Sequence, residues 1–302
     1  MVIEEILVYG AISGGVYALL ALGFTLIYGV SGVVNLAHGS FYMLGAYMFF
    51  IFGTLGFLGS EPILASILAL ILSVLFVGIL GGIMYRLVIH PIIGDDVAVM
   101  VATVCVALIF QQLVLLGFGT SFPPVRWPEG SFVHESTQIL GVTVQYSRIL
   151  AFMVSLGLFG CLLMFITKSK IGKAMRAASQ DREVAMLMGI NTERLYMLAM
   201  VVSAMLAAVA SIFITASTSM SAGAYMWLHP LGLSFSIVIL GGLGSIKGSL
   251  LGGFIIGYAE QAVAIAVPEG GAIIGVVPLT VMLLVLLLRP KGLFGKRVEL
   301  EE

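Results

Sequence analysis

Long apolar runs alternate with short polar or glycine-rich interruptions along the chain, and this pattern predicts a bundle of membrane-spanning helices. A helix needs about 20 apolar residues to cross the hydrocarbon core of a bilayer. The runs that meet or approach this length are residues 6–37, 41–58, 63–85, 97–118, 149–166, 195–218, 231–244, 249–267 and 272–288. The run 231–244 is short and contains glycine, so it is either a full span or a re-entrant segment. We therefore expect an all-α polytopic membrane protein with about eight or nine transmembrane helices.

Two segments, 33–40 and 240–253, combine glycine with polar residues and are predicted to be broken helices. Interruptions at corresponding places in two halves of a chain indicate an internal repeat and an unwound backbone that lines a pathway. Alternatively, these glycines only permit close packing of helices. The candidate pathway residues in the two segments are Asn35, His38, Gly39, Gly242 and Gly244.

Composition supports a membrane protein. Of the 302 residues, 60% are hydrophobic and 10% are charged, and the mean hydropathy is +1.16, whereas about a quarter of the residues in a soluble domain are charged. The net charge of −1 gives no reason to expect a nucleic-acid partner. Cys105 and Cys161 lie inside apolar runs, and we expect them to be small core residues rather than members of a disulfide or metal site.

The distribution of basic residues predicts the orientation in the membrane. Segment 168–194 carries six of the fourteen Lys and Arg residues, and such loops face the cytoplasm. Alternation of the spans then leaves only Arg126 and Arg148 outside. It places these residues inside: Arg86, Lys168, Lys170, Lys173, Arg176, Arg182, Arg194, Lys247, Arg289, Lys291, Lys296 and Arg297. We expect one transmembrane domain, 1–302, with its N-terminus outside, its C-terminus in the cytoplasm and a polar external loop over 119–148.

Motifs for catalysis are missing from the sequence. It has no His-Glu-x-x-His, no Gly-x-Ser-x-Gly, no Cys/His metal spacing and no Gly-x-x-x-x-Gly-Lys-Ser/Thr. We therefore expect no enzymatic activity, catalytic residue, metal or cofactor in this chain. Any energy from ATP has to come from a partner.

Few polar side chains fall inside the predicted spans. Glu260 is a pathway candidate that would face a substrate amine or an outer gate, unless it only reaches the outer interface or a neighbouring helix. His38 either lines the pathway or satisfies the broken backbone. Gln111 and Gln112 are expected to form hydrogen bonds between helices. His229, just before Pro230, is expected in a loop.

Segment 168–194 also contains the pattern of a short helix. Asp181 can cap it, and Gly189 can end it with an apolar contact from Ile190. Its apolar residues are Val184, Leu187 and Met188, and its basic flanks are Arg176, Arg182 and Arg194. A helix this short needs a surface to lie on. It either docks in a groove on a partner or lies on anionic lipid headgroups.

The same segment carries a family resemblance. Glu183, Val184, Ala185 and Gly189 resemble the Glu-Ala-Ala-x-x-x-Gly loop of ABC-importer permeases, with one substitution. The stretches that extend the resemblance are 171–191, 34–47, 238–253 and 289–294. Together they resemble the branched-chain amino-acid importer permeases, and the shorter of the two permease types in that system.

The resemblance implies an assembly in the plasma (inner) membrane of a bacterium or archaeon. A homologous second permease would complete the pore, two ABC ATP-binding subunits would dock on the cytoplasmic loops, and a periplasmic or extracellular binding protein would deliver substrate. The residues implied to lie in the element that contacts an ATPase are Arg176, Arg182, Glu183, Ala185 and Gly189. Trp127 and the prolines of the external loop would contact the binding protein, unless the loop is simply solvated.

The implied function is import of leucine, isoleucine and valine, driven by ATP that only partner subunits bind. Alternatives are a permease for another amino acid, urea or an amide, and an ion-coupled carrier or channel that acts alone. An intramembrane enzyme is a third class, which the lack of a nucleophile, base or metal pattern disfavours.

Overall fold

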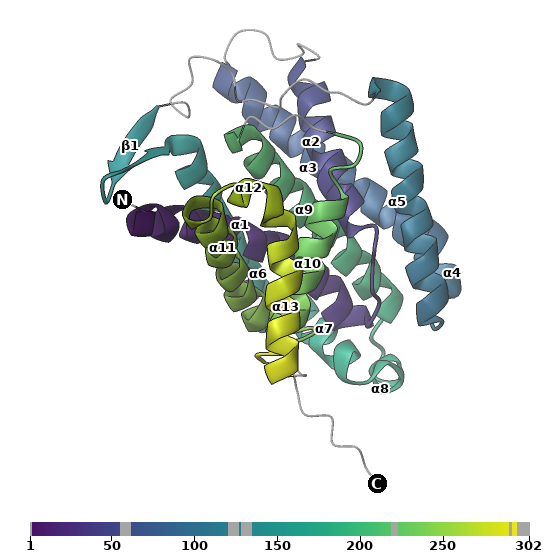
Figure 1. Ribbon diagram of the computed structural model, residues 1–302. Helices are drawn as coiled ribbons and strands as arrows, with labels where there is room; N and C mark the ends of the chain where they lie inside the picture. Colours follow the sequence, from purple (N-terminus) through teal and green to yellow (C-terminus); the bar gives the residue numbers. More distant parts are fainter. Residues whose placement is uncertain are drawn as a thin grey trace.

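A computed structural model describes residues 2–54, 62–119, 127, 135–218, 223–289 and 292–294 (Figure 1). The longer helices are α1 (Val2–Ser31), α2 (His38–Thr54), α3 (Pro62–Met84), α5 (Asp96–Phe118), α6 (Tyr146–Lys168), α7 (Lys170–Gln180), α9 (Thr192–Thr218), α10 (Leu228–Gly241), α11 (Ile246–Ala266) and α13 (Val277–Leu288). The short elements are a π-helix (Tyr85–Ile89), α4 (His90–Ile92), α8 (Arg182–Leu187), α12 (Gly270–Ile273) and a 3-10 turn (Ile274–Val276).

The prediction of an all-α polytopic membrane protein is confirmed. Within the described ranges, six helices are long and apolar enough to cross a membrane, and the segments Leu228–Gly241 and Ile274–Leu288 are shorter apolar helices. One small sheet was not predicted: β1 (Ser136–Ile139) pairs antiparallel with β2 (Val142–Gln145) inside the expected external loop. The number of true spans, their orientation and the internal repeat stay predictions.

Helix α1 lies at the centre of the bundle and packs against α6, α9, α10 and α11. Its contact with α11 depends on glycine. A Cβ atom on Gly253 would lie 2.6 Å from the backbone nitrogen of Ala18, and one on Gly257 would lie 2.5 Å from Cα of Gly14. Small residues let helix backbones approach closely, and van der Waals packing of this kind holds helices together in lipid.

The first break, predicted over residues 33–40, is found at residues 32–37, because α2 is already helical from His38 onward. Gly32 ends α1 with a φ of +72°, and α2 then begins at His38, whose Nε2 lies 3.0 Å from the Leu20 carbonyl oxygen. Leu20 precedes the end of α1 by eleven residues, or roughly 16 Å of helix. The chain therefore turns back along α1, and α2 begins deep inside the bundle.

Helix α10 begins next to the start of α2. A Cβ atom on Gly39 would overlap the carbonyl oxygen of Trp227, the residue just before α10. Helix α2 runs parallel to α9, since His38 faces Ser203 and Gly45 faces Ala208. Helix α10 instead runs toward the end of α1. Two short helices thus begin next to each other in the interior and leave in opposite directions.

The second break is narrower than predicted. It comprises residues 242–245, where Gly242 and Gly244 have φ of 95° and 77°, and α11 is already regular from Ile246 onward. Residues 246–253 were expected to be unwound. They are helical because glycine here serves close packing, as where Gly248 contacts Gly241 of α10.

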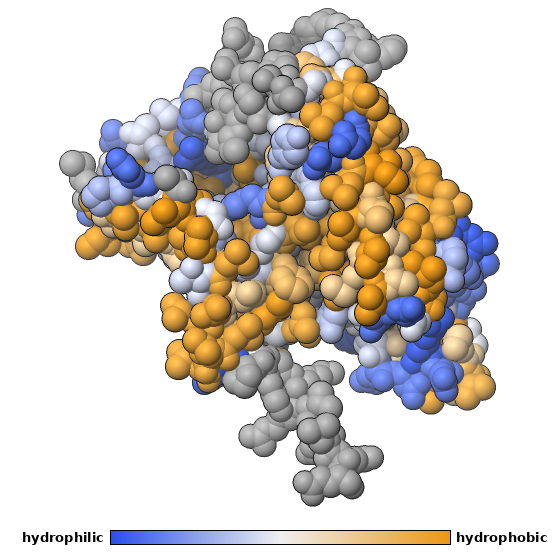
Figure 2. All heavy atoms as spheres, turned by 45° about the vertical axis from the view of Figure 1, so that its right-hand side comes forward, coloured by the Kyte–Doolittle hydropathy of each residue, from blue (hydrophilic) through white to orange (hydrophobic). Residues whose placement is uncertain are grey.

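The positions of both cysteines differ from expectation. Cys105 and Cys161 are exposed on the surfaces of α5 and α6 instead of lying in the core. An apolar setting does not distinguish core from surface in this chain, because the helix faces that meet lipid are as apolar as the interior. Figure 2 shows the broad apolar flank, with hydrophilic residues gathered toward the lower end that carries α7 and α8 in Figure 1.

The α1–α11 contact can be tested with Gly257→Leu. The larger side chain has to separate the two backbones, and we expect a loss of about 2 kcal/mol or more of stability, as for overpacked cores. The midpoint of thermal unfolding in detergent would measure it. Gly160→Leu is the matched control, because a Cβ atom there meets no neighbour within 4 Å. Equal midpoints for the two variants would contradict the role of the glycine.

Candidate functional site: the α7–α8 segment and the cavity beside it

The basic segment folds into two helices, α7 and α8, at one end of the bundle (Figure 1). Ser169 caps α7 by accepting a hydrogen bond from the Gly172 amide at 2.9 Å. The buried face of α7 is formed by Gly172, Met175 and Ala178. Sequence reasoning did not assign α7, although the spacing of three between these small or apolar residues is a helical signal.

Helix α8 has the predicted capping residues. The Asp181 carboxylate accepts from the Val184 amide at 3.0 Å. Gly189 adopts a φ of +80°, and the amides of Gly189 and Ile190 donate to the carbonyls of Met186 and Ala185, each at 3.0 Å. These two bonds form a Schellman motif. The helix therefore begins and ends at defined residues despite its length of six.

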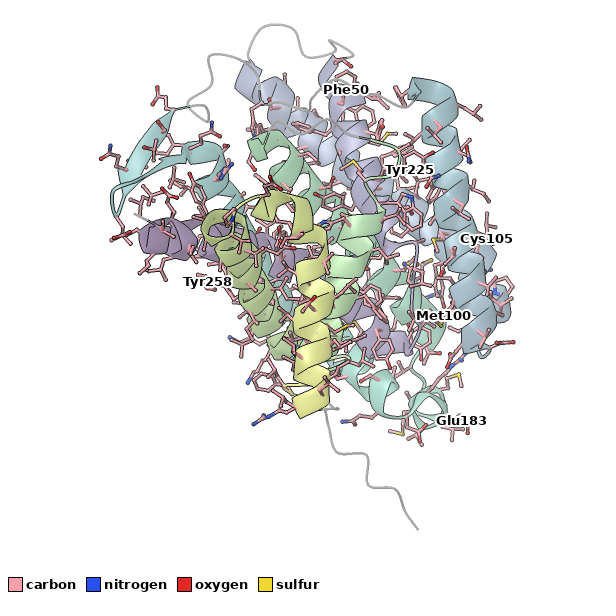
Figure 3. All side chains as sticks on the ribbon, viewed as in Figure 1. Phe50, Met100, Cys105, Glu183, Tyr225 and Tyr258 are labelled. Atoms are coloured by element: carbon pink, nitrogen blue, oxygen red, sulfur yellow. The ribbon has the colours of Figure 1, made fainter. Side chains whose placement is uncertain are left out.

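Helix α8 turns its apolar side chains away from the bundle. Leu187 is 86% exposed and Met188 is 78% exposed, and Val184 is also exposed. Only Ala185 is buried against the bundle. Glu183 lies on the same helix at the lower end of the molecule (Figure 3). Full burial of one such apolar side chain contributes about 1.5–3 kcal/mol, so this surface is suited to binding a partner or a lipid surface.

Of the three predicted flanking arginines, Arg194 is exposed at the start of α9, and the other two differ in their contacts. Arg176 is exposed, with one guanidinium nitrogen 3.4 Å from the Thr167 carbonyl oxygen. The Arg182 guanidinium lies 5.7 Å from the centre of the Tyr196 ring on α9, which fits a cation–π contact. Arg182 therefore connects α8 to the start of α9.

An ion pair joins the start of α9 to the end of α3. Arg86 in the π-helix pairs with Glu193, and His90 Nε2 lies 3.4 Å from the same carboxylate. These groups are about half exposed, so the pair contributes at most about 1 kcal/mol to stability. It nevertheless brings Arg86 to the end of the molecule that carries α7 and α8, where the sequence predicts the cytoplasm.

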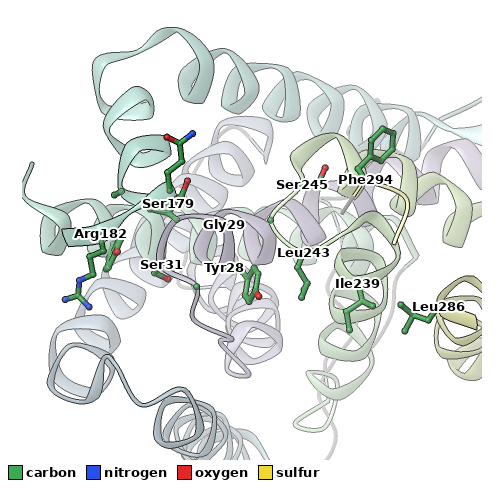
Figure 4. A pocket seen from close by; sticks show the side chains of 16 residues that line it. Tyr28, Gly29, Ser31, Ser179, Arg182, Ile239, Leu243, Ser245, Leu286 and Phe294 are labelled. Carbon is green, nitrogen blue, oxygen red and sulfur yellow. The ribbon is translucent and has the colours of Figure 1, made fainter. Parts of the chain in front are cut away.

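A cavity of about 840 Å³ lies beside α7 and α8. Figure 4 shows how side chains from distant parts of the chain border it. The lining residues come from the end of α1, α7, α8, the start of α9, the end of α10, the second break and the C-terminal end: Tyr28, Gly29, Val30, Ser31, Gly32, Ala178, Ser179, Gln180, Arg182, Tyr196, Ile239, Leu243, Gly244, Ser245, Leu286 and Phe294.

Both predicted breaks reach this cavity. Gly32, where the first break begins, and Gly244, in the second, are among its lining residues. A Cβ atom on Gly29 would come within 3.4 Å of Gly244, so the two regions touch. Unwound backbone at membrane depth is tolerated where it is buried in protein or lines a water-filled cavity, and the breaks satisfy this condition.

The other pathway candidates do not line the cavity. The Asn35 side chain accepts from the Ala37 amide at 3.0 Å and donates to the sulfur of Met200 at 3.5 Å. His38 is fully buried between Leu20 and Ser203, and Gly39 permits the contact of α2 with Trp227. These three residues join α1, α2, α9 and α10 at the first break. Gly242 forms the C-cap of α10.

Glu260 belongs neither to the lining of the cavity nor to the cluster of Asn35, His38 and Gly39 at the first break. Its side chain is 1% exposed, and its carboxylate Oε1 lies 3.7 Å from His229 Nε2. The expectation that His229 belongs to a loop is wrong, because it is the second residue of α10. The His-Pro pair suggested a turn, but Pro230 occupies the first turn of α10, where its missing N–H leaves no bond unmade.

Trp127 does not have the exposed position expected of a docking residue. It is buried, with its ring 5.5 Å from that of Phe49 and 5.9 Å from that of Phe213. The loop is anchored here because burial of a large aromatic ring is favourable. Several residues named in the sequence analysis lie outside the described ranges, namely Pro123, Pro124, Arg126 and Pro128 in the loop and Lys291, Lys296 and Arg297 at the C-terminal end. Gln111 forms the expected interhelical hydrogen bond, accepting from Trp227 Nε1 at 2.6 Å.

Comparison with known proteins identifies the family. Residues 6–286 match the family described as branched-chain amino acid transport system, permease component. The chain belongs to this family. It is 34% identical over 296 residues to the high-affinity branched-chain amino acid transport system permease protein BraD of Pseudomonas aeruginosa, which covers 96% of this chain and 95% of that protein.

Two further relatives come from other organisms. The permease protein LivH of Escherichia coli is 29% identical over 293 residues, covering 95% of this chain and 94% of LivH. A probable branched-chain amino acid transport permease protein of Methanocaldococcus jannaschii is 30% identical over 316 residues, covering 98% and 92%. With its apolar helices, this member of the permease family is a multi-pass plasma-membrane protein and a component of membrane transport.

The capping of α8 can be tested by hydrogen exchange. Asp181→Ala removes the acceptor for the Val184 amide, which costs about 1 kcal/mol, so the amides of 182–190 should exchange about fivefold faster. Mass spectrometry of the detergent-solubilised protein would measure this. Asp181→Asn keeps an acceptor and is the control. Equal acceleration in both variants would contradict the capping role.

Proposed function

We propose that this chain is the permease subunit of an ATP-driven importer of branched-chain amino acids: leucine, isoleucine and valine. The observation that carries the proposal is the exposed apolar surface of α8 on a firmly capped helix. The relatives named above support the substrate class, since their names describe branched-chain amino acid transport. A binding protein would deliver the amino acid on the opposite side.

In the proposed mechanism, α8 fits into a groove on an ABC ATP-binding subunit. Leu187 and Met188 would supply apolar contacts, while Glu183 and Arg176 would form polar contacts at the margin. Two ATP-binding subunits would serve this chain and a homologous second permease. ATP binding would bring the two ATP-binding subunits together and carry the α8 helices with them.

The cavity explains how a movement of α8 can reach the proposed pathway. Arg182 of α8 and Ser179 of α7 border the same space as Gly32 and Gly244 of the two breaks. A displacement of α8 therefore changes the walls of the cavity without needing a long chain of contacts. We propose that this cavity is the cytoplasmic end of the pathway, which opens and closes as the two permeases move against each other.

The docking role predicts the effect of Leu187→Glu. A carboxylate cannot be buried in an apolar groove without a large cost, so the affinity for the ATP-binding subunit should fall at least about tenfold. Leucine uptake into proteoliposomes should fall with it, while the amount of protein in the membrane stays the same. Leu187→Met, which keeps an apolar side chain of similar volume at the same position, is the control.

Measurements of leucine uptake also distinguish the proposed importer from an ion-coupled carrier and from a permease for another solute. The assembled complex should take up leucine only with ATP, and Leu187→Glu should abolish most of it. Leucine uptake by this chain alone under an ion gradient would show an ion-coupled carrier instead. ATP-dependent uptake of urea or an amide in place of leucine would retain the importer but replace its substrate.

A further inference from the structure

Glu260 stands out because it is a carboxylate buried within α11, a helix that is long and apolar enough to cross a membrane. Among the described residues, it is the one Asp or Glu that is buried, and neither of its carboxylate oxygens forms a hydrogen bond. It lies fourteen residues beyond the start of α11 at Ile246, or roughly 21 Å along the helix. An ionisable group buried inside a helix of this kind is expensive and usually has a function.

The packing of α1 against α11 holds this carboxylate in place. Next to Glu260, Gln261 donates to the Ser13 hydroxyl of α1 at 3.3 Å. The Tyr17 hydroxyl, also on α1, is close enough to the carboxylate to serve as a hydrogen-bond donor, although neither carboxylate oxygen has a partner at ordinary hydrogen-bond geometry. The third neighbour is His229, and its distance of 3.7 Å is too long for a hydrogen bond.

His229 connects the buried carboxylate to an open flank. It is 45% exposed, and a Cβ atom on Gly275 would lie 3.8 Å from its ring. The side chains of Tyr225 and Leu228, which precede His229 in the chain, and of Val276, which follows Gly275, are exposed as well. Figure 3 shows Tyr225 just above the start of α10. Histidine and tyrosine beside a buried acid are costly to present to lipid. This flank is therefore better suited to face a pathway or another subunit.

We propose that Glu260 binds the α-ammonium group of the amino acid during its passage, and that His229 faces the substrate carboxylate. This inference rests on the proposed function, because it assigns the recognition of that substrate to particular side chains. An ammonium group supplies the hydrogen-bond donors and the positive charge that the Glu260 carboxylate lacks.

The pairing of the two side chains fits an amino-acid zwitterion. In such a molecule the ammonium and carboxylate groups are attached to the same carbon atom. In the protein, the Glu260 carboxylate, which would bind the ammonium, and the His229 imidazole, which would bind the carboxylate, likewise lie side by side. The substrate ammonium would replace His229 beside Glu260, and the released imidazole would donate to the substrate carboxylate. Leu228 and Val276 offer apolar contact to a branched aliphatic side chain. No covalent step is involved.

The test compares Glu260→Gln with Glu269→Gln in the complete complex in proteoliposomes, with leucine-loaded binding protein. Glu269 follows the end of α11 and is exposed, so the same chemical change there should have no effect. We expect Glu260→Gln to lower the number of leucine molecules imported per ATP hydrolysed at least about tenfold, the loss expected for a hydrogen-bonded charge. Glu260→Asp, which keeps the carboxylate, should restore part of this ratio.

Two analogues distinguish the ends of the substrate. Excess 3-methylbutylamine, which has the ammonium but no carboxylate, should inhibit uptake by the wild type more strongly than by Glu260→Gln. Inhibition by 4-methylpentanoate, which has only the carboxylate, should instead depend on His229 and weaken in His229→Ala. Equal inhibition of all three proteins by both analogues would overturn the assignment.

The results that would contradict the role of Glu260 differ from those that would contradict the proposed function. An unchanged import ratio in Glu260→Gln overturns the role of Glu260. Parallel loss of import and of ATP hydrolysis, with a lower thermal midpoint, also overturns it and makes Glu260 structural. A wild-type complex that hydrolyses ATP but imports no leucine would contradict the proposed function itself.

Discussion

The backbone of a membrane protein cannot leave its polar groups unpaired in hydrocarbon, and this constraint decides how the interrupted helices of this chain are arranged. The first interruption is buried between α1, α9 and α10, where Asn35 and His38 bond to neighbouring backbone groups. The second interruption borders the cavity and touches the end of α1. Both need α1 at the centre of the bundle, and α1 can hold that position because glycine lets α11 pack closely against it.

This arrangement also connects the two regions to which we assign function. Helix α8 lies at the end of the molecule where α1 finishes, so its Arg182 shares a cavity with both breaks. Glu260 lies further along α11, beside His229 at the start of α10. Helix α10 thus runs from the proposed recognition group to the cavity. A movement of α8 that alters the cavity therefore acts on the same helix that carries His229.

Local features were predictable where a few adjacent residues determine the geometry. The capping of α8 by Asp181 and its end at Gly189 followed from residue types at fixed spacing, and the structure contains both. The exposed turn of apolar residues on α8 was predicted in the same way. The exposed position of the two cysteines was not predicted. An apolar neighbourhood looks the same in the sequence whether a helix face meets lipid or protein.

The sequence by itself determined that the chain is a membrane-embedded helical protein, that it has two interruptions near glycine, and which residues cap α8, since hydropathy, glycine content and capping depend on neighbours along the chain. It did not determine the bounds of the interruptions, because glycine that permits close packing looks the same in the sequence as glycine in a break. Its resemblance to importer permeases also indicated the family. Only the tertiary structure decided that α2 and α10 begin side by side, that the two breaks meet at one cavity, and that His229 of α10 faces Glu260 of α11. These contacts join residues that are far apart in the chain, and the uniform apolarity of the spans carries no signal of which helix faces which.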